Sequence, residues 1–274
     1  MIEGEILLYE GYAWIVKGFQ HPPGRVIAYP RYDLVNRRKL SAHEALRVAA
    51  SQTEFWDCLK LFVPQIPVES STPLVPEEPT CRLASEAISE ILDVDRDDVL
   101  ISGSCLLGEY NDVDVIVLGA NDGTLERLER ATSRGIVGRA SAWFSIEEYY
   151  RKHGALDAFT YSLLRWDRPT AIVINGVVVN VKMLSMTEGR AGCVDRVLQR
   201  RAYSGLINVL RPIRRVVLPA LFDVLLETGE RVIMETLREL YSDIRPGEYY
   251  VIGEVERRES GTYLVIDRGA VRAR

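Results

Sequence analysis

The chain has 274 residues, of which 47% are hydrophobic and 27% are charged, and its formal net charge is −5. This composition is typical of a folded protein with one large domain or two small ones, and the negative charge argues against a general binder of polyanions. The sequence has no apolar run of about 18 residues, the length that a membrane helix needs. Its first residues also lack the pattern of a signal peptide. We therefore expect a cytoplasmic protein that does not bind a membrane.

The first part of the chain, residues 1–74, is predicted to hold strands, a helix and a linker. Apolar alternation predicts strands over residues 5–9, 13–17 and 25–29. Ser41 followed by Glu44 is a capping-box pattern, so a helix is expected over residues 40–62. Five prolines lie between residues 64 and 79, and they indicate a linker.

The middle part, residues 75–187, is predicted to be a mixed sheet with flanking helices. Helices are expected over residues 78–92, 124–134 and 156–166, with a further helix capped by Ser145. Two strands over residues 170–174 and 177–184 flank Asn175-Gly176, a pair that suits the tight turn of a hairpin.

The last part, residues 188–274, is predicted to be rich in strands. These strands cover residues 205–210, 215–226, 249–256 and 262–267, and a helix is expected over residues 231–241. A basic cluster opens this part and indicates a solvated helix face or a contact with a phosphate backbone. Its members are Arg190, Arg196, Arg200 and Arg201. The whole chain is thus expected to be an α/β protein of the α+β kind, with small N-terminal and β-rich C-terminal parts around a mixed-sheet core.

The four cysteines are widely spaced, at Cys58, Cys81, Cys105 and Cys193. No pair has the Cys-x-x-Cys spacing that is typical of a zinc site. We expect them to be buried free thiols, because disulfides inside cells are found mainly in hyperthermophiles.

The most informative motif is an apolar strand, a Gly-Ser turn and a second strand that opens with two aspartates. Asp112 and Asp114 are two residues apart, so on a strand their side chains point to the same face. Neighbouring carboxylates repel each other unless a cation lies between them, and Mg²⁺ or Mn²⁺ suits their oxygen atoms. Gly103 and Ser104 offer backbone N–H groups and a hydroxyl that suit a phosphate. The alternative interpretation is that Asp112 is a turn residue and Asp114 a solvated strand residue.

This motif, from Ser102 to Leu118, resembles the nucleotidyltransferase superfamily that includes DNA polymerase beta, the CCA-adding enzymes and kanamycin nucleotidyltransferase. The resemblance implies that Asp112 and Asp114 hold the metal that bridges the nucleotide phosphates, and that Gly103 and Ser104 hold those phosphates. The segment from Val16 to Tyr32 is also similar to uncharacterised archaeal proteins described as predicted nucleotidyltransferases.

The resemblance also implies a third carboxylate on a later strand, and the best-matching strand contains no acid. Asn180 occupies the expected place, where its amide oxygen is a candidate metal ligand, and Lys182 on the same face is a candidate phosphate contact. A lysine on a strand is also often a solvated edge residue. Other acids of the middle part could take the third place instead, and they are Glu109, Asp157 and Asp167.

The function expected from the resemblance is transfer of a nucleoside monophosphate from an NTP to an acceptor hydroxyl with Mg²⁺ or Mn²⁺, the acceptor being an unknown molecule such as RNA or a protein. The alternative is a non-catalytic protein of the same fold that binds a nucleotide, a nucleic acid or a protein. The segment from Arg25 to Arg31, with Tyr29 and Tyr32, interleaves basic and aromatic residues and suits a nucleic acid. It could equally be a strand whose arginines cover apolar surface.

Overall fold

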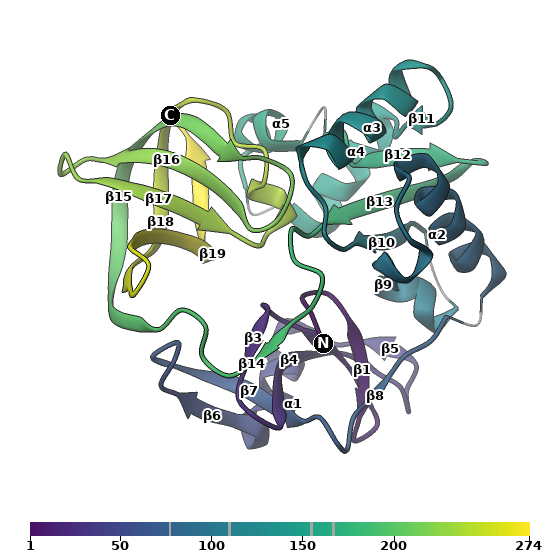
Figure 1. The fold of residues 1–274 in the computed structure, drawn as a ribbon, viewed down its shortest axis with the longest axis horizontal. Helices are drawn as coiled ribbons and strands as arrows, with labels where there is room; N and C mark the ends of the chain where they lie inside the picture. The colour runs from purple at the N-terminus through teal and green to yellow at the C-terminus, as the bar shows by residue number, and fades with distance from the viewer. Residues whose placement is uncertain (77, 109–110, 154–155, 166–167) are drawn as a thin grey trace.

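The computed structural model describes residues 1–76, 78–108, 111–153, 156–165 and 168–274. Figure 1 shows three parts, which we call the N-terminal lobe, the central unit and the barrel. The fold is mixed α+β, as expected. Among the described residues, none of the helices is both long and apolar enough to cross a membrane.

The N-terminal lobe is a seven-stranded sheet in the order β6-β7-β4-β2-β1-β8, with β5 paired to β4. Its first strands are β1 (Ile6–Tyr9), β2 (Tyr12–Val16), β4 (Arg25–Asp33) and β5 (Arg38–Lys39). The predicted hairpin and third strand are confirmed, because β1 pairs with β2 and β2 pairs with β4. Apolar side chains from alternate strand positions form the core of the lobe, and they include Leu7, Trp14, Val16, Val26, Ala28 and Ile66.

The prediction of a helix over residues 40–62 is correct only for its first turns. The capping box is present, since Ser41 Oγ accepts a hydrogen bond from Glu44 N and Glu44 Oε2 accepts one from Ser41 N. The helix α1 (Ala42–Ala49) then passes through a 3₁₀ turn, η1 (Ala50–Gln52), into β6 (Thr53–Trp56). β6 is rich in β-branched and aromatic residues and pairs with the next strand, which outweighs the helical pattern.

The expected proline-rich linker is partly strand. Residues 64–67 complete β7 (Leu61–Pro67), and β8 (Thr72–Pro73) pairs with β1. The prolines therefore fall within a sheet as well as between two parts of the chain.

The central unit is a five-stranded sheet in the order β11-β12-β13-β10-β9 with helices around it. Its strands are β9 (Val99–Ser102), β10 (Val113–Val117), β11 (Gly138–Arg139), β12 (Ala171–Ile174) and β13 (Val177–Met183). Its helices are α2 (Pro79–Leu92), α3 (Asp122–Ser133), α4 (Ala142–Glu148) and α5 (Ala158–Arg165), with a π-helical turn, η4 (Tyr149–His153), and two 3₁₀ turns, η2 (Arg96–Asp98) and η3 (Gly103–Leu107).

Most predicted elements of the central unit are confirmed. The β12–β13 hairpin forms around Asn175-Gly176, and α2 and α3 lie where helices were expected. The helix α4 starts earlier than expected, because Ser141 rather than Ser145 caps it by accepting from Phe144 N.

The C-terminal part begins with β14 (Arg190–Ala191), which pairs with β3 (Gln20–His21) of the N-terminal lobe, and continues as a closed barrel. The barrel order is β15-β16-β17-β19-β18, and β17 and β19 are parallel. These strands are β15 (Val197–Arg214), β16 (Ala220–Leu226), β17 (Arg231–Thr236), β18 (Gly247–Arg258) and β19 (Thr262–Ala273).

The helix expected over residues 231–241 is wrong. Val232, Met234 and Thr236 point into the barrel and alternate with more exposed residues, which is the period of a strand. Only the short 3₁₀ turn η5 (Glu239–Tyr241) follows β17.

The basic cluster of residues 190–201 does not form a helix face. Arg190 belongs to β14, and Arg200 and Arg201 belong to β15. Arg196 pairs with Asp57 and Arg200 pairs with Glu254 and Glu256, while Arg201 pairs with Glu230. The last three arginines therefore form ion pairs between strands and between parts of the chain, and these pairs offset much of their positive charge.

The expectation of free thiols is wrong, because all four cysteines form disulfides. Cys58 is bonded to Cys193, 135 residues away, and Cys81 is bonded to Cys105, 24 residues away. Spacing along the chain did not reveal the pairs, since folding brings their Cα atoms to 5.5 and 6.1 Å of each other. Each bridge therefore joins two elements that are separate in sequence.

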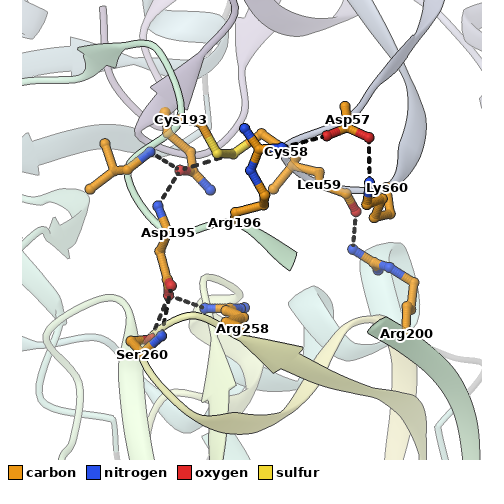
Figure 2. The surroundings of a disulfide bond; sticks show 12 residues. Asp57, Cys58, Leu59, Lys60, Cys193, Asp195, Arg196, Arg200, Arg258 and Ser260 are labelled. Atoms are coloured by element: carbon orange, nitrogen blue, oxygen red, sulfur yellow. Dashed lines mark hydrogen bonds and ion pairs between the residues drawn. A yellow bond between two sulfur atoms is a disulfide. The ribbon is translucent and has the colours of Figure 1, made fainter. Parts of the chain in front are cut away.

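Figure 2 shows the Cys58–Cys193 bridge, which joins the N-terminal lobe to the segment that leads into the barrel. Asp57 accepts from Arg196, and the Leu59 carbonyl accepts from Arg200 at 2.7 Å. Because these contacts surround the disulfide, covalent and polar bonds hold the same two segments together.

Candidate functional site

The two predicted aspartates lie side by side at the start of β10. Asp112 directly precedes the strand and Asp114 is its second residue. The alternate residues of β10, Val113, Val115 and Val117, are fully buried in the core that the sheet shares with α2 and α3. Since strand residues alternate, Asp112 and Asp114 point to the opposite face of the sheet.

Strand pairing brings the other predicted site residues to the same place. Asp114 pairs with Ser102 of the antiparallel strand β9, and with Asn180 of the parallel strand β13. Gly103 and Ser104 follow β9 directly, so the Gly-Ser turn lies next to the aspartates. The structure thus assembles from three adjacent strands the set of residues that the motif suggested.

Gly103 is required by its surroundings as well as by its backbone. Its φ of 72° lies in the left-handed region that favours glycine. A Cβ atom on Gly103 would overlap the Oδ2 atom of Asp114. The turn therefore brings a bare backbone against the carboxylate, and any other residue here would displace one of the two.

Asn180 is held in one orientation by a buried network. Its Oδ1 accepts from Arg168 at 2.6 Å, and its Nδ2 donates to Asp112 at 2.7 Å and to Asp114 at 3.2 Å. Arg168 is itself paired with the buried Glu148. Because the amide oxygen faces a guanidinium, which only donates hydrogen bonds, the NH₂ group faces the carboxylates.

Lys182 pairs with a carboxylate from the start of the chain. Its Nζ lies 2.8 Å from Glu3 Oε1, and Lys17 Nζ lies 3.0 Å from the same atom. Glu3 also accepts from Gly18 N at 2.7 Å. Burial opposes ionisation of Glu3, but Lys182, Lys17 and this hydrogen bond outweigh it and lower the pKa of Glu3 to about 2. Lys182 is therefore neither a solvated edge lysine nor an uncompensated charge.

The face with the two aspartates forms one wall of a cleft of about 740 Å³. We call this wall the carboxylate wall, and its residues are Gly103, Ser104, Asp112, Asp114 and Lys182. The facing wall comes from the N-terminal lobe, which lies opposite the central sheet in Figure 1. We call it the hairpin wall, because its residues, Arg31, Tyr32, Asp33, Leu34, Arg37, Arg38 and Lys39, belong to β4, β5 and their turn.

Among the described residues, none of the alternative acids named above is shown to join Asp112 and Asp114 as a third carboxylate. Asp157 accepts from the N–H and hydroxyl of Thr160 at the start of α5, and it pairs with Arg272 of the barrel. Glu109 and Asp167 lie outside the described residues.

The segment from Arg25 to Tyr32 is a strand whose two ends have different roles. Arg25 pairs with Glu54 of β6, which fits the structural interpretation. Arg31 and Tyr32 line the cleft, which keeps a binding role for that end of the strand open.

The oxygen atoms that could bind a metal suit one hard cation better than two. Among the described residues, no group of three or more His, Cys, Asp or Glu side chains is placed to hold a metal ion. The carboxylates of Asp112 and Asp114 both approach Asn180 Nδ2, so they converge on one small region. Mg²⁺ is commonly held by one or two carboxylates together with substrate phosphates. Asn180 presents a donor rather than an oxygen, so in this orientation it adds no ligand.

Sequence reasoning missed Glu3, Arg168 and Glu148. Glu3 precedes the first predicted strand, and Arg168 falls between a helix and a strand, so neither has a pattern that marks a site. Glu148 lies in a predicted helix, yet the residue is only 3% exposed and its carboxylate accepts from Arg165 and Tyr161. Contacts of this kind arise from the packed fold and leave no signal in the sequence.

Comparisons of the chain with protein-family models, with curated proteins and with solved structures found no match. The function must therefore be argued from the cleft and its residues.

Proposed function

We propose that the cleft binds a nucleoside triphosphate with one divalent cation, and that the protein transfers the nucleoside monophosphate to an acceptor hydroxyl. The observation that carries this proposal is the convergence of Asp112 and Asp114 beside the Gly103–Ser104 turn on one wall of the cleft. The resemblance of the same residues to nucleotidyltransferases supports it. The cellular setting we propose is the cytoplasm of a cell that tolerates disulfides, as a hyperthermophile does.

Each residue of the carboxylate wall has a separate role in the proposed transfer. Asp112 and Asp114 would hold Mg²⁺ or Mn²⁺, which supplies positive charge to the phosphate oxygens. Gly103 would let the backbone of the turn lie against the Asp114 carboxylate, and Ser104 would offer its hydroxyl to a phosphate. In the transfer, the acceptor oxygen forms a bond to the α-phosphorus, the bond to pyrophosphate breaks, and the hydroxyl proton passes to solvent. Catalysis would rest on positioning and charge neutralisation.

A second function, binding without transfer, is favoured by the orientation of Asn180. Its NH₂ group hydrogen-bonds both carboxylates, and Arg168 prevents the amide from turning without losing a charge-assisted bond. The site has two acids, whereas the resembled enzymes have three. It therefore has less negative charge with which to bind a second cation. Such a site could hold a nucleotide and lack turnover.

The test is calorimetric titration of the protein with ATP, GTP, CTP and UTP, with and without Mg²⁺, followed by an assay with NTP labelled at the α-phosphate. The Asp112→Asn/Asp114→Asn variant should lose Mg²⁺-dependent binding. A matched control is Asp95→Asn/Asp97→Asn, which makes the same charge change at two exposed positions before β9. Binding with pyrophosphate release supports transfer, and binding without release supports the second function. No NTP binding by the unaltered protein would overturn both.

A further inference from the structure

The hairpin wall concentrates positive charge in a chain whose net charge is negative. Four basic residues of the hairpin wall line the cleft, and they are Arg31, Arg37, Arg38 and Lys39. All four are exposed. The chain carries a net charge of −5, so this cluster is a local feature rather than a consequence of composition. A local basic wall attracts a polyanion to the cleft without making the whole surface a polyanion binder.

The two acids near this cluster both have partners, one within the hairpin and one on α1. Asp33 accepts from both the backbone N–H and the side-chain amide of Asn36, at 3.0 and 2.7 Å, which fixes the turn. Glu44 of α1 accepts from both terminal nitrogens of Arg38, at 3.1 and 2.6 Å. Arg38 is thereby held in place and its charge is paired, while Arg31 on β4 and Arg37 in the turn extend the basic surface.

Tyr32 adds an aromatic ring to the hairpin wall. It is half-buried and lines the cleft next to Arg31. Burial raises the pKa of Tyr32, the neighbouring Arg31 opposes this rise, and the negative charges of Asp114 and Asp112 add to it. The phenol therefore lies beside Arg31 and within electrostatic reach of the carboxylate wall. A ring in this position offers a face on which a base can stack.

We propose that the hairpin wall, residues 31–39, binds the backbone of a single-stranded nucleic acid, which is the acceptor whose hydroxyl meets the carboxylate wall. This inference rests on the proposed function. Arginine forks match phosphate oxygens, and interleaved aromatic rings stack bases, so the wall carries both elements of single-strand recognition. The hairpin wall and the carboxylate wall line the same cleft, so an acceptor bound along the first faces the aspartates of the second.

The test measures binding of a fluorescently labelled oligoribonucleotide of about 12 nucleotides by anisotropy at several salt concentrations. The hairpin variant is Arg31→Gln/Arg37→Asn, because Arg37 has a φ of 49°, which asparagine tolerates. The control is Arg82→Gln/Arg134→Gln, which removes the same charge from two exposed positions outside the cleft. A second variant, Arg31→Lys/Arg37→Lys, keeps both charges.

We expect the hairpin variant to weaken oligoribonucleotide binding about tenfold or more and to lower the salt slope by about 1.4, as two lost contacts with a single strand should. The control and the lysine variant should bind nearly as the unaltered protein does. Binding of Mg²⁺ and ATP should be unchanged in all three variants, which separates this inference from the proposed function.

Three results would overturn the inference. The first is no oligoribonucleotide binding by the unaltered protein although it binds Mg²⁺ and ATP. The second is an equal loss of oligoribonucleotide binding in the control. The third is a parallel loss of ATP binding in the hairpin variant, which would assign the hairpin wall to the nucleotide phosphates instead.

Discussion

The two walls of the cleft differ in how their side chains are held. On the carboxylate wall, Asp112 and Asp114 extend from a central strand and share the amide of Asn180, which Arg168 and Glu148 hold from behind. On the hairpin wall, the basic side chains are exposed and stand on two strand ends and a turn. A preorganised wall suits a small charged ligand bound in one geometry, whereas exposed arginines suit a flexible ligand.

One disulfide lies beside the carboxylate wall, and the other holds the lobe that carries the hairpin wall. Cys105 lies in η3, one residue after Ser104, and its bond to Cys81 ties the Gly-Ser turn to α2. Cys58 lies in the N-terminal lobe, and its bond to Cys193 ties that lobe to the segment before the barrel. The first bridge fixes a wall locally, and the second fixes the position of a lobe.

The largest expected effect is on stability. The Cys58→Ser/Cys193→Ser variant should lose about 5 kcal/mol of unfolding free energy and the Cys81→Ser/Cys105→Ser variant about 3.5 kcal/mol, because a bridge that closes a longer loop restricts the unfolded chain more. Urea unfolding without reductant measures both values. A larger loss from the Cys81–Cys105 pair would show that local packing around η3, and not loop length, dominates.

A smaller effect on stability is expected at the ion pair between Glu3 of the N-terminal lobe and Lys182 of the central unit. Glu3→Gln leaves Lys182 and Lys17 without their shared carboxylate. The folded pKa of Glu3 is about 2, below its ordinary 4.5, so its contribution to stability is present above pH 4.5 and is lost as the pH falls toward 2. The difference between the unaltered protein and the variant should be about 3 kcal/mol at neutral pH.

Denaturant unfolding across pH 2–7 checks this prediction. Glu10→Gln, in the exposed turn between β1 and β2, is the control, because it removes the same charge from an exposed position, and it should change the stability little. A stability difference that stays constant down to pH 2 would mean that Glu3 acts through packing rather than through its charge.

The smallest effect concerns the third position of the carboxylate wall. Asn180→Asp adds a negative charge beside Asp112 and Asp114 and should raise Mn²⁺ affinity about tenfold, or about 1.4 kcal/mol. Asn175→Asp adds the same charge at the tip of the same hairpin and should leave the affinity unchanged. Unchanged affinity in Asn180→Asp would indicate that Arg168 neutralises the new acid.

The carboxylate wall could be predicted from the sequence because it follows from regular strands. The alternation of Asp112 and Asp114 with buried valines is visible in the sequence, and so is the Asn175-Gly176 turn that aligns Asn180. The hairpin wall could not be placed opposite it, because no local pattern records that residues 31–39 face a strand of residues 113–117 across a cleft.

The failures of prediction have physical causes as well. Residues 53–56 and 231–236 were expected to be helical but lie in sheets, because pairing with partner strands decided their structure. The disulfides and the Glu3–Lys182 pair join residues far apart in the chain, so only the folded arrangement reveals them.

The most direct test of the carboxylate wall as a metal site is electron paramagnetic resonance of Mn²⁺ titrated into the protein with and without ATP. We predict one bound Mn²⁺ per chain, held more tightly when ATP is present. This binding should be lost in Asp112→Asn/Asp114→Asn and kept in Arg31→Gln/Arg37→Asn. Equal Mn²⁺ binding by the unaltered protein and the Asp112→Asn/Asp114→Asn variant would contradict it, because the carboxylate wall would then not be the metal site.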